Sequence, residues 1–77
     1  MPITVKFFAR LREEVDKDEV QVDYQDNLST LQVWQTVTGQ ETLPEKVLIA
    51  VNQEYTNETH LLNDNDEVAF FPPVTGG

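Results

Sequence analysis

The segment DEVAFFPPVTGG (Asp66–Gly77) joins a strand pattern to a tail that cannot continue that strand. Apolar side chains alternate through its first half, so that neighbours such as Phe70 and Phe71 point to opposite faces, as in a β-strand. Pro72 and Pro73 then remove two consecutive backbone donors, so we expect the ladder of hydrogen bonds to stop there. The pattern predicts a folded domain before the prolines and a projecting tail after them.

We therefore expect a domain over residues 1–71 and an extended tail over residues 72–77, composed of Pro72, Pro73, Val74, Thr75, Gly76 and Gly77. The prolines favour an extended backbone, and a tail of this length reaches roughly 20 Å. The two final glycines have no side chains, so this end fits a channel that any Cβ would block. The functional group it presents is the α-carboxylate of Gly77.

Three further strands are expected N-terminal to this segment. Alternating or continuous apolar residues indicate them, and a short edge strand is also expected between residues 53 and 66. The three strands are Ile3–Ala9, Glu19–Tyr24 and Lys46–Asn52. A polar connection with a helical turn, burying Leu11 and Val15, is expected between the first two, which can form an antiparallel hairpin.

The segment between residues 28 and 39 predicts the main helix. Ser29 and Gln32 have the spacing of a capping box, and Leu28 and Val33 have the spacing of a hydrophobic staple. Gly39 is placed to end the helix in the left-handed conformation. With strands on both sides of one main helix, the chain is predicted to be α+β. A mixed sheet packed on that helix, with the first and last strands adjacent in the middle, is the β-grasp or ubiquitin-like fold.

The length, composition and net charge of the chain exclude or disfavour several classes of function. A chain of 77 residues has little room for an enclosed active site. It has no cysteine, which excludes thiol nucleophiles and thiolate metal sites, and we expect no metal, since His60 is the single histidine. A net charge of −9 disfavours nucleic acid as a partner. We expect no membrane span and a soluble, cytoplasmic protein.

The tail segment resembles the C-terminal signature of the small subunits of molybdopterin synthase. VKFFARLRE (Val5–Glu13) and AVNQ (Ala50–Gln53) match other recurring stretches of that family. The resemblance covers essentially the whole chain. It implies a sulfur carrier with no permanently bound cofactor.

The resemblance also implies a mechanism and partners. An ATP-dependent adenylating enzyme, related to ubiquitin activators, converts the Gly77 carboxylate into an acyl-adenylate. A sulfur donor then turns this transient state into a thiocarboxylate. The tail enters the large synthase subunit, which holds the catalytic groups, and the sulfur passes to cyclic pyranopterin monophosphate. Small subunits are expected to pair with a dimer of large ones, giving a heterotetramer.

Alternation and resemblance together suggest the partner interface. If the first and last strands are neighbours, Phe8 and Phe71 share an exposed patch beside the tail root, and such patches usually mark interfaces. The resemblance adds Tyr55 and the basic position Arg12. Alternatively, Phe8 or Phe71 completes a second small core, and Tyr55 is an ordinary turn residue. The acidic cluster between residues 13 and 19 either steers a basic partner or is a solvated loop.

Other functions stay open at this point. A carrier that supplies sulfur for thiazole synthesis or tRNA thiolation shares the fold and the chemistry. A ubiquitin-like modifier would instead form isopeptide bonds to lysines. A plain interaction module would have an inert tail.

Overall fold

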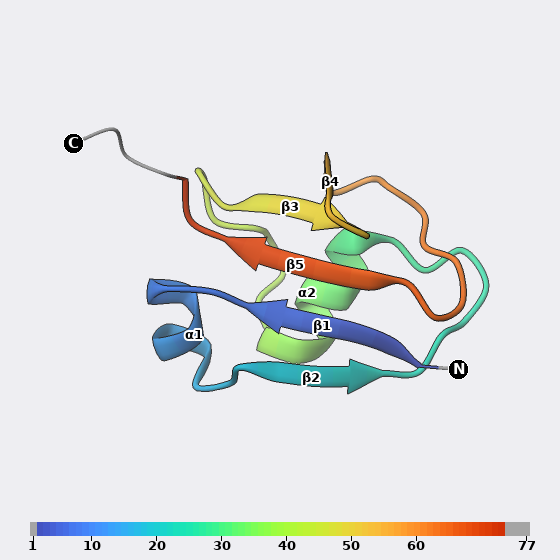
Figure 1. Cartoon of the computed structure of the whole chain (residues 1–77), viewed down its shortest axis with the longest axis horizontal. Coiled ribbons are helices and arrows are strands. Elements are labelled where there is room, and N and C mark those ends of the chain that lie inside the picture. Colours follow the sequence, from blue (N-terminus) through green and yellow to red (C-terminus); the bar gives the residue numbers. More distant parts are fainter. Residues whose placement is uncertain (1, 74–77) are drawn as a thin grey trace.

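The computed structural model describes residues 2–73, which form a mixed five-stranded sheet with its main helix packed on one face (Figure 1). The strand order is β2-β1-β5-β3-β4. β1 and β5 are parallel neighbours in the middle of the sheet, and the other neighbouring pairs are antiparallel. The elements are β1 (Ile3–Phe7), α1 (Arg10–Val15), β2 (Glu19–Val22), α2 (Thr30–Thr38), β3 (Leu48–Val51), β4 (Glu54–Thr56) and β5 (Glu67–Phe71). The predicted α+β class and β-grasp topology are confirmed.

The face of the sheet that carries α2 holds the hydrophobic core, because alternation sends every second strand side chain toward the helix. Phe7 and Phe70 stack with ring centroids 5.7 Å apart, and Trp34 of α2 meets Phe70 edge-on at 5.1 Å. The indole N–H of Trp34 donates to a backbone carbonyl, so its burial leaves no donor unsatisfied. The fully covered residues of the two central strands are Ile3, Val5, Phe7, Val68 and Phe70.

The helix α2 begins and ends where the sequence predicts. Ser29 Oγ accepts from the Gln32 N–H at 3.1 Å, and Gln32 Oε1 accepts from the Ser29 N–H at 2.8 Å, which completes the capping box. Leu28 and Val33 are both buried in the core. Gly39 ends the helix with φ 76°, in the left-handed region. The helix is short, so its stability depends on these caps and on its packing against the sheet.

The first strand is shorter than the predicted Ile3–Ala9. It ends at Phe7 because Ala9 has φ 53°, which breaks the extended backbone and turns the chain into α1. Leu11 of α1 is 5% exposed, so the expected helical turn that buries this residue is confirmed. The turn places α1 beside the carboxyl end of β1 (Figure 1).

The strands predicted at Glu19–Tyr24 and Lys46–Asn52 are also shorter in the structure. β2 ends at Val22, which pairs with Ile3, the first residue of β1. Lys46 and Asn52, the end residues of the second predicted segment, have positive φ angles of 73° and 51°. The strand between them is therefore confined to β3. In both segments, the strand-like sequence pattern therefore extends beyond the residues that pair by hydrogen bonds.

The turn before β5 is held by a buried carboxylate. Asp66 is 9% exposed, and its Oδ2 accepts from the Asn63 N–H at 2.8 Å. Its Oδ1 accepts from Asn52 Nδ2 at 2.9 Å, which ties this turn to the end of β3. The segment therefore forms the turn that leads into β5.

Candidate functional site

The face of the sheet opposite α2 carries a set of large apolar side chains. In the ladder between β3 and β5, Leu48 is opposite Phe71, and Ala50 is opposite Ala69. In the ladder between β3 and β4, Ala50 is opposite Tyr55. Directly opposite residues project to the same face, so these five residues share one side of the sheet. This side is turned toward the viewer in Figure 1, with α2 behind it.

Phe8 extends this set to the next strand. Its N–H donates to the Phe70 carbonyl at 3.2 Å, so the ladder between β1 and β5 continues one residue beyond β1. Alternation places the Phe8 side chain on the same face as Phe71. We call Phe8, Leu48, Tyr55 and Phe71, with Ala50 and Ala69 between them, the outer-face patch.

The large side chains of the patch are exposed to different degrees. Phe8 is 45% exposed, Leu48 36% and Tyr55 75%, and Phe71 is half-buried. The rings of Tyr55 and Phe71 lie 5.7 Å apart, so each partly covers the other. Of the two alanines in the patch, Ala50 is buried at 8% exposure and Ala69 is half-buried. Grouped, exposed apolar side chains of this kind are typical of a protein interface.

The structure brings together three of the four predicted interface residues. Phe8, Phe71 and Tyr55 lie on the same face, with Tyr55 in β4 and in contact with Phe71. Arg12 belongs instead to α1, where its Nε lies 3.4 Å from Asp18 Oδ1 in an exposed ion pair. Leu48 was missed, because its place in a continuous apolar run hides which face it occupies.

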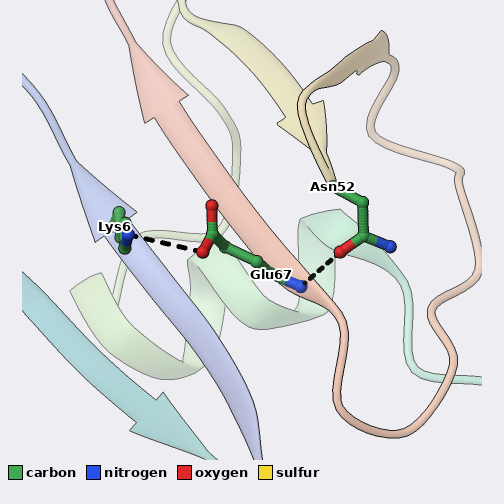
Figure 2. Close-up of polar contacts among 3 residues, drawn as sticks. All are labelled: Lys6, Asn52 and Glu67. Carbon is green, nitrogen blue, oxygen red and sulfur yellow. Dashed lines mark hydrogen bonds and ion pairs between the residues drawn. The ribbon is translucent and has the colours of Figure 1, made fainter.

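A polar strip crosses the same face beside the patch. Lys6 of β1 and Glu67 of β5 form an ion pair with Nζ and Oε1 3.3 Å apart, as Figure 2 shows. The Glu67 N–H donates to Asn52 Oδ1 at 3.0 Å, which anchors the start of β5 to the β3–β4 turn (Figure 2). Polar groups beside an apolar centre fix the orientation in which a partner docks.

The root of the tail leaves the sheet at one end of the patch. β5 ends at Phe71, and half-buried Pro72 and Pro73 line a groove of about 200 Å³ with residues of α1 and of the loop before β3. The other tail residues named above, Val74, Thr75, Gly76 and Gly77, lie outside the described residues. Pro72 and Pro73, the tail residues that the structure describes, therefore lie next to the outer-face patch.

Residues 2–73 show no group of three histidine, aspartate or glutamate side chains that could hold a metal ion. His60 Nδ1 lies 3.1 Å from Thr56 Oγ1, and its backbone carbonyl accepts from the Thr30 N–H at 3.0 Å, so it has a structural role in the loop after β4. Within the same residues, the helices are all too short or too polar to cross a lipid bilayer.

Comparison with known proteins identifies a family that this chain matches. Residues 5–77 match the model of the ThiS family. The molybdopterin synthase sulfur carrier subunit of Escherichia coli is 44% identical, and the match covers 97% of this chain and 99% of that protein.

Solved structures agree on the fold. SAMP1 from Haloferax volcanii superposes with a TM-score of 0.83 at 24% identity, covering 100% of both chains, which shows a shared fold. A chain in the complex of subunits 1 and 2 of the molybdopterin-converting factor from Helicobacter pylori superposes with a TM-score of 0.64 at 25% identity. That match also covers 100% of both chains.

Proposed function

This chain belongs to the ThiS family, and we propose that it is the sulfur carrier subunit of a molybdopterin synthase, with Gly77 as the residue that carries the sulfur. The observation that carries the proposal is the match over nearly the whole chain to a carrier subunit of that name. The tail residues support it as well, since two glycines after two prolines form a thin segment without side chains.

The proposed chemistry takes place at the carboxyl carbon of Gly77. A carboxylate is a poor acyl donor, so an adenylating enzyme first joins it to AMP from ATP and releases pyrophosphate. A sulfur donor then supplies a sulfide equivalent, whose sulfur bonds to the carbonyl carbon while AMP leaves. The product is a thiocarboxylate. The adenylate and the thiocarboxylate are transient states of the chain. The proposed use of ATP supports a cytoplasmic location for this carrier.

Sulfur delivery then takes place in the large synthase subunit. The thiocarboxylate sulfur bonds to a carbon of cyclic pyranopterin monophosphate and its bond to the Gly77 carbonyl carbon breaks, while water supplies the oxygen that restores the carboxylate. Two such transfers supply the two sulfurs of the molybdopterin dithiolene. Because the chain has no cysteine, a persulfide cannot form on it, which supports the backbone terminus as the carrying group.

The outer-face patch is the proposed docking surface for the large subunit. The patch adjoins the tail root, so a partner seated on it would receive the tail in its own active site. The Helicobacter pylori complex supports a partnership of this kind, since it pairs a chain of this fold with a second subunit. Phe8, Phe71 and Tyr55 are proposed contacts. Arg12 is proposed to contact a partner from α1, away from the patch.

Intact-mass measurement tests the proposal. The chain is incubated with an adenylating enzyme, ATP and a sulfur source, and its mass is expected to rise by the difference between sulfur and oxygen. A chain lacking Gly77 and a chain extended by one alanine should remain unchanged while retaining the same thermal unfolding. A ladder of higher-mass conjugates would contradict the proposal and favour a protein modifier.

A further inference from the structure

A second surface lies at the edge of β2, on the opposite side of the sheet from β4, where no other strand within residues 2–73 pairs with it. The Phe7 N–H donates to the Asp18 carbonyl at 2.9 Å, which fixes the phase of the antiparallel ladder between β1 and β2. Because hydrogen-bonded residues alternate along an antiparallel strand, the backbone groups of Glu19 and Gln21 point away from β1. An edge with such groups can pair with another extended strand.

A groove lies beside this edge, between β2 and α2. Its volume is about 490 Å³, and its apolar floor consists of half-buried residues that also pack against the core. The floor residues are Val20, Val22, Tyr24 and Val37. A strand added to β2 would send alternate side chains into this groove and the others to the opposite face.

The charge around the edge selects the occupant. Asp16, Asp18, Glu19 and Asp23 are all exposed in or beside β2, and two bases, Lys17 and Arg12, which pairs with Asp18, offset only part of their charge. The whole chain carries a net charge of −9, so a second copy would be repelled at this edge. A segment with basic side chains would be attracted to the edge, and its arrival would be accelerated by the field.

We propose that the free edge of β2 and the groove beside α2 bind an extended segment of a partner protein in which apolar residues alternate with Lys or Arg. Backbone pairing with Glu19 and Gln21 supplies the register, and apolar side chains fill the groove over Val20 and Val22. This surface lies on the α2 side of the sheet and at its far edge, so it stays free when a partner covers the outer-face patch.

The probe for this proposal is a capped peptide, Lys-Val-Lys-Val-Lys-Ile-Lys, titrated into the isotope-labelled full-length chain and followed by NMR. We expect shift changes concentrated in residues 19–24 and 36–37, and new protection of the Glu19 and Gln21 amides from hydrogen exchange. Affinity should fall as salt is added, because the attraction is between exposed charges.

Two variants make the test specific. Thr36→Lys places a cation at the groove on an exposed helix position, and should weaken peptide binding about three- to fivefold. Gln53→Lys makes the same change of charge in the β3–β4 turn and should leave affinity at the wild-type value. Gln21→Pro removes the backbone N–H of residue 21, which does not donate to β1. The substitution should abolish peptide binding while the chain stays folded.

Several results would overturn the proposal. One is equal binding of a peptide with Glu in place of every Lys, and another is equal affinity of the Thr36→Lys and Gln53→Lys chains. Shift changes confined to the outer-face patch, or concentration-dependent pairing of two chains through β2, would also contradict it. None of these results bears on sulfur loading at Gly77, so the two proposals fail separately.

Discussion

The two faces of the central strands use neighbouring phenylalanines for opposite purposes. Phe7 and Phe70 face α2 and are at most 2% exposed, whereas Phe8 is 45% exposed and Phe71 is half-buried on the other face. The pairs are adjacent in sequence and alike in chemistry, so strand alternation alone separates core from surface. The comparison teaches that hydrophobicity on this sheet stabilises the fold on one face and is available for binding on the other.

The largest expected effect comes from the covered face. Phe70→Ala removes a ring that contacts both Phe7 and Trp34, and should lower the free energy of unfolding by about 3–5 kcal/mol. Phe71→Ala should lower it by about 1 kcal/mol, because the Phe71 ring is half-exposed. Urea denaturation of both variants measures the difference. Equal losses would show that the outer face is a second core rather than a binding surface.

The second expected effect concerns binding of the large subunit, for which the outer face matters rather than the face that α2 covers. Phe71→Glu should weaken association with the large subunit at least about thirtyfold, since a buried aromatic contact at an interface centre contributes ~2 kcal/mol or more. Gln21→Glu introduces the same charge in β2, at an exposed position that is opposite Thr4 and outside the patch, and is the matched control. Calorimetric titration gives both affinities. If the two variants bind alike, Phe71 is not part of the interface.

The sequence alone predicted the sheet face that α2 covers well, and the outer face only in part. The capping residues Ser29 and Gly39 act locally, so their roles can be recognised from spacing. The patch depends on register between strands far apart in the chain, which is why Leu48 opposite Phe71 was missed. Arg12 was grouped with the patch by resemblance, but the turn at Ala9 places it on α1.

A smaller effect is expected for α2, the helix that covers one face of the sheet. Ser29→Ala removes the side-chain acceptor of the capping box and should cost about 1 kcal/mol of stability. Large-subunit affinity should be unchanged, because Ser29 is at the start of α2 and not on the outer face. Thermal unfolding and titration of the same sample check both halves. A loss of affinity without a loss of stability would contradict this separation of the two faces.

The smallest effect is expected in the polar strip of the open face. Lys6→Gln should change the free energy of unfolding by less than ~1 kcal/mol, because the ion pair with Glu67 is substantially exposed to solvent. Glu67→Gln should behave similarly, since its backbone bond to Asn52 is retained. Denaturation midpoints at low and high salt measure the contribution. A loss of several kcal/mol would mean that this strip stabilises the fold as the core does.

Single-turnover sulfur transfer tests the central claim most directly. The chain is first loaded as a thiocarboxylate, then mixed with the large subunit and cyclic pyranopterin monophosphate, and both the chain mass and molybdopterin are followed over time. Two chains should return to the carboxylate form for each molybdopterin produced, and the Phe71→Glu chain should react more slowly at limiting large subunit. Molybdopterin formed at an undiminished rate by a chain lacking Gly77 would contradict the account.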